Sequence, residues 1–227
     1  MAARVIFLHE LKEESEHLGK KVNDLINLIN HGFEVAQSFI ITHQAYLDFL
    51  KENNLDNKIR HLSSIGLEHQ IEKHLAESHL PHDSIREILK AYRNLGTVLE
   101  DIEIDVNGQK VNGDAALIEK IRQIFISSYP AKKVNVVVQK VHFGKHGKLR
   151  TSSKFINSIH PFSGNEVSLL ENMLSKFKNL FYLPHEIDFT LEKGRIVINK
   201  IKPETHAPSH DIPPNETSYK IIVNSNY

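Results

Sequence analysis

The chain has 227 residues, with 28 basic and 28 acidic side chains and no cysteine. The balanced charge gives no overall attraction to nucleic acids or anionic membranes, and the lack of cysteine excludes disulfides, thiolate catalysis and cysteine-based zinc sites. No apolar run reaches the roughly 18 residues that a membrane-spanning helix needs, and the first residues lack a secretory signal pattern. We therefore expect a water-soluble globular protein in the cytoplasm.

The first 50 residues predict two helices separated by a short strand. Apolar side chains recur at helical spacing over residues 18–31, and Gly32 suits the left-handed conformation that often ends a helix. Residues 33–41 predict a strand with an apolar end. Thr42 is then a favourable N-cap for the second helix, because its side-chain oxygen can accept a hydrogen bond from an unpaired backbone N–H.

Residues 55–94 continue the helical pattern. Pro81 divides this segment, since proline lacks the N–H that a helix interior requires. Beyond it, Ser84 and Glu87 have the spacing of a capping box, which predicts that a helix starts there. The N-terminal part of the chain, residues 1–95, is therefore expected to be a largely helical lobe.

Residues 96–205 mix strands with helices and are expected to form a second lobe. Two hairpins are predicted, one turning at Asn107–Gly108 and one at Lys193–Gly194. Between them lie a predicted helix (115–127), a strand rich in β-branched residues (134–141), a glycine-punctuated loop region (144–164) and another helix (169–181). The remaining residues, 206–227, form a tail with one candidate strand at 219–223. The fold class is therefore mixed α/β.

Familiar phosphate and metal motifs are absent. The sequence contains neither a P-loop nor a dinucleotide-binding fingerprint. His142 and His146 are four residues apart but lie among glycines rather than on a predicted helix, and His206 and His210 lie in the proline-rich tail. The histidine spacings therefore predict no metal site.

Seven basic residues and no acidic residue lie between positions 132 and 154. Such a strip could contact the phosphates of a nucleotide or of a nucleic acid, or it could be a solvated loop. Nucleic acid is the weakest of these interpretations, because Phe143 and Phe155 alone make a poor surface for base stacking.

Carboxylates alternate with apolar residues along the strand before the second hairpin turn. Glu186 and Asp188 alternate with Ile187 and Phe189, so that one strand face presents acidic side chains while the other packs. The acidic face is either solvated or aimed into a cleft, where carboxylates can hold a Mg²⁺ ion that bridges nucleotide phosphates.

Five segments in order carry further motifs. They are LGKKVNDLINLINHGFEV with SFIITHQAY (within 18–46), IRQIFISSY (121–129), VNVVVQKVHFGKHG (134–147), HPFSGNE (160–166), and PHEIDFTLE with IVINKIKPET (within 184–205). Together they resemble the N-terminal ATP-binding domain of pyruvate phosphate dikinase and phosphoenolpyruvate synthase. The resemblance implies an ATP-grasp-like fold, in which two lobes hold Mg-ATP and the phosphoryl group passes to a histidine on a separate domain.

The resemblance also implies site residues. Lys20 falls on the family's phosphate-contacting lysine, and Gln139 to Val141 fall on the strand near the adenine site. Asp188 replaces a metal-binding glutamate. Lys200 stands where the family has a metal-site glutamine, and Lys202 where it has an arginine.

Departures from the family pattern imply reduced activity. The arginine-bearing V-R-S strand, expected between residues 80 and 96, has no counterpart, and the glycine-rich phosphate loop appears as Thr151–Phe155. Lys200 would repel a metal ion, and the phosphohistidine domain and pyruvate-binding barrel have no counterpart in the sequence. We therefore expect a degenerate ATP-binding domain in which Mg²⁺ binding is weak or lost and phosphotransferase activity is impaired or absent. A separate histidine-bearing phosphocarrier or dikinase-like chain would be its partner.

A second hypothesis, of a different class, is a non-enzymatic regulatory or interaction scaffold that retains the fold, because a fold does not determine a function. An empty cleft, or a Lys20 paired with an internal carboxylate, would favour it. Nucleotide binding therefore has to be tested directly, with and without Mg²⁺.

Overall fold

The computed structural model describes residues 3–14, 16–96, 103–131, 133–152, 155–158, 160–204 and 221–223. The chain divides into two compact units whose segments are interleaved: Met1–Val22 with Gln37–Val141, and Asn23–Ala36 with His142–Tyr227. The boundary expected near residue 95 falls inside the first unit. The reason is that the hairpin and the helix after this point complete the sheet and the core that the N-terminal segments begin.

The first unit is built on an antiparallel five-stranded sheet of order β1-β2-β5-β3-β4. The strands are β1 (Val5–Phe7), β2 (Ser38–Ile41), β5 (Val136–Lys140), β3 (Glu103–Val106) and β4 (Gln109–Asn112). Asn107 and Gly108, both with positive φ, form the turn between β3 and β4. The predicted Asn-Gly hairpin is thus confirmed, because this dipeptide tolerates the left-handed backbone that a tight turn needs.

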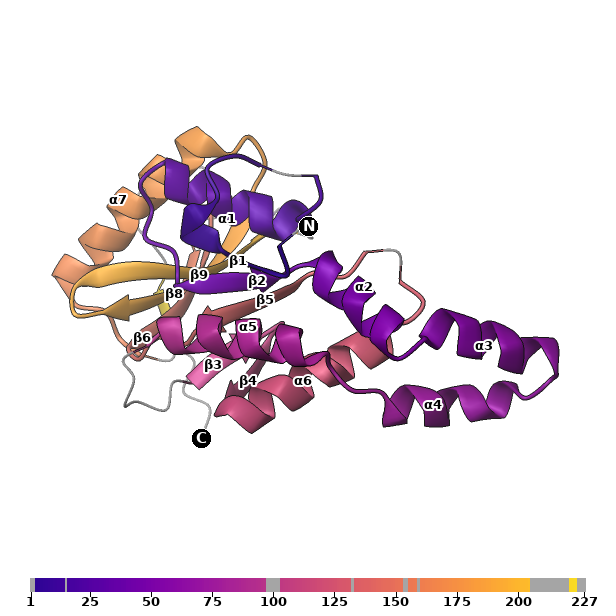
Figure 1. Ribbon diagram of the computed structural model, residues 1–227. Helices are drawn as coiled ribbons and strands as arrows, with labels where there is room; N and C mark the ends of the chain where they lie inside the picture. The colour runs from indigo at the N-terminus through magenta and orange to yellow at the C-terminus, as the bar shows by residue number, and fades with distance from the viewer. Residues whose placement is uncertain are drawn as a thin grey trace. The chain divides into compact units, whose positions relative to one another are not determined.

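Figure 1 shows the helices of the first unit, and most of them contribute buried side chains to one core cluster. They are α2 (His43–Glu52), α3 (Leu55–Ser64), α4 (Ile71–Glu77), α5 (His82–Asn94) and α6 (Asp114–Ser128), with short 3₁₀ turns η1 (Leu8–Glu10) and η2 (Glu68–Gln70). Tyr46, Phe49 and Phe125 are fully buried and their rings contact one another. These aromatic contacts join α2 to α6 within the core cluster.

Two helix starts differ from the prediction in instructive ways. Thr42 is the N-cap of α2, but its hydroxyl donates to the carbonyl of Ala3 instead of capping the helix. The capping box predicted at Ser84 is wrong, since α5 begins at His82 directly after Pro81 and Ser84 is buried within it. Glu87, its supposed partner, instead pairs with Arg4 at 2.8 Å.

The second unit is built on a sheet of order β10-β7-β6-β8-β9. Its strands are β10 (Ile221–Val223), β7 (Phe155–Ser158), β6 (Lys145–Arg150), β8 (His185–Glu192) and β9 (Arg195–Pro203), antiparallel except for the β7–β10 pair. Helix α1 (Lys20–Asn30) runs into this unit, and α7 (Gly164–Leu180) buries one face in it. The hairpin predicted around Lys193–Gly194 is confirmed as β8 and β9.

Strands β6 and β7 lie where loops were predicted, and that expectation is wrong. Glycines suggested loops, but here they allow close packing within strands or beside them. A Cβ on Gly147 would lie 2.5 Å from the ring of Phe189, and one on Gly144 would lie 2.2 Å from the carbonyl oxygen of Leu191. Glycine at such positions reports a close approach, not a turn.

Helix α7 begins five residues earlier than predicted, at Gly164. A complete capping box holds this end, because Ser163 accepts from the N–H of Glu166 and Glu166 accepts from the N–H of Ser163. The mixed α/β class is confirmed. Over the described ranges, no helix combines the length and apolar character needed to cross a bilayer. Parts of four predictions lie outside the described residues: the hairpin residues Val98 and Ile102, the basic residues Lys132 and Lys154, the loop residue Ser153, and tail residues 206–220 and 224–227.

Candidate functional site

The second sheet has one apolar and one charged face where β6, β8 and β9 pair. On the side of α7, Leu149, Ile187 and Ile201 are buried. The alternate residues form the opposite surface, here called the charged face, which consists of Lys148, Arg150, Glu186, Asp188, Lys200 and Lys202. Strand register places Asp188 between Lys148 and Lys200, and Glu186 between Arg150 and Lys202. Predicted residues Asp188, Lys200 and Lys202 are thus brought together.

Glu186 is the centre of the ion pairs on this face. Its carboxylate lies 2.8 Å from Lys202 Nζ, 3.3 Å from Arg150 Nε and 3.9 Å from Lys148 Nζ, and its side chain is only 11% exposed. Burial opposes ionisation of Glu186, but the hydrogen bond from Lys202 and the neighbouring cations outweigh it and lower the pKa of this carboxyl. The same hydrogen bond raises the pKa of Lys202. Glu186 therefore holds three cations in place while remaining charged.

Asp188 and Lys200 are less fully engaged. Lys148 Nζ lies 3.7 Å from Asp188 Oδ1, close enough for an ion pair but too far for a hydrogen bond, and Oδ1 is buried without a hydrogen-bond partner. Lys200 is exposed, and within the described part of the chain it forms no ion pair. The charged face therefore offers an unengaged cation and a carboxylate oxygen that lacks a donor.

The charged face does not fit a resident Mg²⁺ ion. Magnesium prefers an octahedron of oxygens, typically one or two carboxylates plus phosphates. Glu186 already accepts from Lys202 and Arg150. Asp188 Oδ1 is the remaining candidate metal ligand, but the cationic Nζ of Lys148 lies only 3.7 Å from it. The opposite charges of Lys148 and Asp188, at about this distance near a protein surface, attract each other by roughly 4 kcal/mol. No group of three or more histidine or carboxylate side chains able to hold a metal occurs among the residues described.

The other predicted site residues belong to the first unit. Gln139 lies on β5, whose neighbours Val136 and Val138 point into the core cluster, so that Gln139 points to the opposite side of the sheet. It is 7% exposed, and its Nε2 has no hydrogen-bond partner. Val141, the last residue of this unit, donates its N–H to the carbonyl of Glu103 at 2.9 Å. Gln139 thus retains a buried donor that a ligand acceptor could satisfy.

Lys20 is the first residue of α1 and follows Gly19, whose φ is +85°. It is exposed, and no carboxylate of the described residues forms an ion pair with it. A free ammonium group beside the first unpaired N–H groups of a helix is a favourable arrangement for an anion. The internal pairing that would have favoured the scaffold hypothesis is therefore absent from the described residues.

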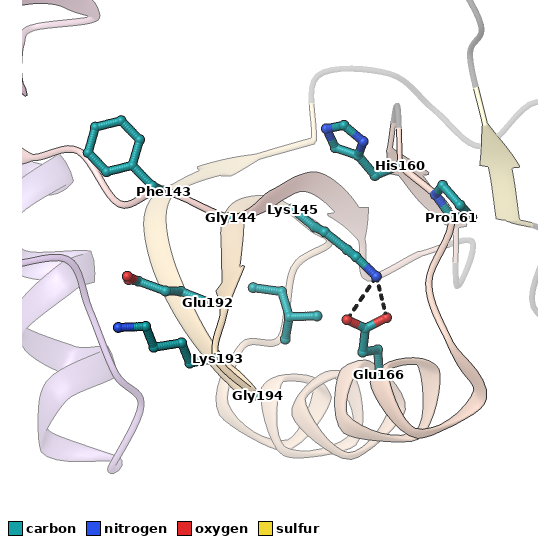
Figure 2. A pocket seen from close by; sticks show the side chains of 10 residues that line it. Phe143, Gly144, Lys145, His160, Pro161, Glu166, Glu192, Lys193 and Gly194 are labelled. Atoms are coloured by element: carbon teal, nitrogen blue, oxygen red, sulfur yellow. Dashed lines mark hydrogen bonds and ion pairs between the residues drawn. The ribbon is translucent and has the colours of Figure 1, made fainter.

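A cavity of about 780 Å³ lies beside the second sheet, at the start of β6 and the β8–β9 turn (Figure 2). Lys145 reaches across it to Glu166 of α7, with bonds of 2.9 and 2.7 Å. The bond from Lys145, together with that from the Ser163 N–H, lowers the pKa of Glu166. Lys145 is therefore already neutralised by Glu166.

The predicted basic strip is divided between the two units. Lys133 and Lys140 belong to the first unit, where Lys133 donates to the carbonyl of Glu16. Lys145 pairs with Glu166, whereas Lys148 and Arg150 lie on the charged face. Glu186 was predicted on an acidic strand face and Lys148 and Arg150 in the basic strip, but the sequence did not predict that the three share one face. Cross-strand register, which links β6 to β8, was the signal that could have found them.

Comparison with known families gives one match. Residues 15–106 match the model of the AMP/ATP-binding domain of pyruvate phosphate dikinase. The resemblance predicted from the sequence is therefore confirmed for this segment, which contains Lys20 and ends with β3. Curated proteins provide no match to the chain.

Two of the solved structures that are similar to this chain come from a bacterium and a yeast. D-alanine–D-alanine ligase from Bacillus anthracis, complexed with ATP, has a TM-score of 0.46 and 13% identity, and the match covers 81% of this chain and 52% of the ligase. C-terminally truncated Cdc123 from Schizosaccharomyces pombe has a TM-score of 0.40 and 13% identity, with coverage of 56% and 68%. The chain thus spans about half the length of the ligase.

Proposed function

We propose that this chain is a nucleotide-binding module of the dikinase type, which binds ATP or a related adenine nucleotide and has little or no phosphotransferase activity alone. The observation that carries the proposal is the match of residues 15–106 to an AMP/ATP-binding domain. Lys20, within that segment, is free to contact a phosphate, as the family resemblance requires.

Two features outside the matched segment support nucleotide binding. Gln139 keeps a buried amide donor without a partner, which is costly unless a ligand satisfies it. The charged face gathers four cationic side chains around two carboxylates, which suits phosphate oxygens.

The segment Thr151–Ser152 supports low catalytic activity. Thr151 donates its N–H to the carbonyl of His185 at 2.9 Å, and its hydroxyl accepts from the N–H of His185 at 2.8 Å. The N–H of Ser152 donates to Glu204 at 3.2 Å. These amides donate to His185 and Glu204 and are not available to a phosphate. Any phosphoryl transfer would need an acceptor on a separate histidine-bearing phosphocarrier or dikinase-like chain.

Calorimetric titration with ATP, ADP and AMP tests the proposal, using the wild type and Lys20→Ala. We expect saturable ATP binding that the substitution weakens by about tenfold or more, because a charge-assisted contact contributes roughly 1.5–3 kcal/mol. Lys58→Ala, which removes an exposed lysine of α3, is the matched control and should leave affinity unchanged. A folded protein that shows no saturable binding at millimolar ATP would refute the proposal and favour the scaffold hypothesis.

A further inference from the structure

The charged face carries more positive charge than its own carboxylates neutralise. Four of its side chains are cationic and two are carboxylates. The strand register places each carboxylate of β8 between a cation of β6 and a cation of β9. Three of the cations converge on Glu186, whereas Lys200 has no ion pair among described residues. The uncompensated positive charge of this surface therefore favours an anionic ligand.

We propose that the charged face binds the polyphosphate of an adenine nucleotide directly, as the metal-free anion, and that Mg²⁺ weakens this binding. The inference rests on the proposed function and specifies the form of its ligand. Lysine ammonium groups act as point charges on phosphate oxygens, and the guanidinium of Arg150 can contact two oxygens at once. Mg²⁺ would neutralise the polyphosphate and bring its own positive charge against these side chains.

The arrangement around Glu186 explains how four cations can remain on one surface without a ligand. Lys202 and Arg150 bind different oxygens of this carboxylate, and Lys148 lies between Glu186 and Asp188. The two carboxylates therefore hold the cations apart and oriented until the anion arrives. Such preorganisation reduces the entropy that binding would otherwise cost.

Asp188 distinguishes direct phosphate binding from a metal site. Its Oδ1 lacks a hydrogen-bond donor and lies 3.7 Å from Lys148 Nζ. If a metal ion were the partner, Asp188 would be its ligand, and removing its charge would reduce nucleotide affinity. If phosphate oxygens bind here, Asp188 repels them, and removing its charge releases Lys148 to the ligand and raises affinity.

The test is calorimetry of the full chain with ATP, in EDTA and in excess Mg²⁺ at the same ionic strength. We expect severalfold tighter binding in EDTA. Lys200→Gln should weaken binding in EDTA about tenfold, the effect of losing one charge-assisted contact, whereas Asp188→Asn should strengthen it severalfold. Lys178→Gln, the same charge change at an exposed site on α7, is the control and should stay within twofold of the wild type.

The outcomes separate this inference from the proposed function. ATP binding that requires Mg²⁺ and is lost in Asp188→Asn would overturn the inference and leave nucleotide binding intact. Absence of ATP binding under both conditions, in protein with an unchanged thermal unfolding curve, would overturn the proposed function itself. Inorganic tripolyphosphate is the remaining probe: affinity equal to that of ATP would mean that the face binds polyanions without selecting a nucleotide, which would also overturn the inference.

Discussion

Strands β5 and β8 are inner strands of the two sheets, yet they use their side chains in opposite ways. On β5, Val136 and Val138 enter the core cluster, and Val137 and Gln139 on the other face are buried as well. On β8, apolar residues are buried on one face only, while Glu186 and Asp188 belong to the charged face. Burial on both sides of β5 therefore stabilises the first sheet, while Gln139 keeps a buried donor without a partner. The second sheet keeps one face for electrostatic interactions.

This contrast predicts that stability and ligand binding can be separated by mutation. Changes in the core of the first unit should act on folding, whereas changes on the charged face should act on binding and make stability depend on pH. The four substitutions that follow test this separation, and the first two are compared with a similar substitution at an exposed site.

Phe125→Ala should have the largest effect, on stability. Phe125 is fully buried on α6 and contacts the rings of Tyr46 and Phe49. Removing the ring leaves a cavity, and such substitutions cost about 3–5 kcal/mol of unfolding free energy. Urea denaturation measures the loss. Phe143→Ala is the matched control, because Phe143 is 70% exposed and should change stability by less than about 0.5 kcal/mol. Similar losses for both variants would contradict the assignment of this core.

Glu186→Gln should reduce stability by about 1–2 kcal/mol at neutral pH, because three cations lose their carboxylate. The pKa of Glu186 is lowered by folding, so its contribution is full above the unfolded pKa, near 4.5, and is lost as pH falls through the folded value. The difference between wild type and variant should therefore become smaller as the pH falls below the unfolded pKa. Denaturation at pH 7 and at pH 3 tests this, with Glu52→Gln, an exposed site, as control. A difference that grows toward low pH would rule out the lowered pKa.

Gln139→Leu should separate binding from stability most clearly. The substitution removes a buried amide whose Nε2 lacks a partner, so unfolding free energy should stay the same or rise slightly. ATP affinity should fall about three- to tenfold if this amide donates one neutral hydrogen bond to the ligand. Calorimetry and urea denaturation of the same sample measure both quantities. Unchanged affinity would remove Gln139 from the nucleotide site.

Ser84→Ala should have the smallest effect, a gain of up to about 1 kcal/mol. The hydroxyl of Ser84 is fully buried on α5 without a hydrogen-bond partner, and alanine is the better helix former. Thermal unfolding would show the gain as a rise in melting temperature. A loss would indicate that the hydroxyl is satisfied, for example by a buried water molecule.

Local signals allowed part of the fold to be predicted from the sequence. Asn107–Gly108 and Lys193–Gly194 determine their hairpins, because their positive φ values are encoded in the dipeptides themselves. Strand β6 could not be predicted, since Gly147 is required by the ring of Phe189, a residue 42 positions away. The capping box at Ser84 was wrongly predicted because the helix already begins at His82, directly after Pro81.

The candidate site was predicted only in part, for a related reason. Asp188, Lys200 and Lys202 came from motifs on one hairpin, where sequence neighbours are also spatial neighbours. Lys148 and Arg150 join them through β6, and their pairing with β8 depends on register across 36 to 40 residues. Alternation along β8 showed which residues share a face, but not that Glu186 would bind three cations at its centre.

The close contact between Gly147 and Phe189 gives the protein a spectroscopic reporter. A hydrogen on the glycine Cα points along the bond that a Cβ would occupy, and the ring carbon of Phe189 lies 2.5 Å from that Cβ position. The ring current should therefore displace this proton resonance well away from its random-coil position. Gly147 immediately precedes Lys148 on β6. A nuclear magnetic resonance titration that follows this single signal could thus show whether an anion bound to the charged face changes the contact between Gly147 and Phe189 on the opposite face of the sheet.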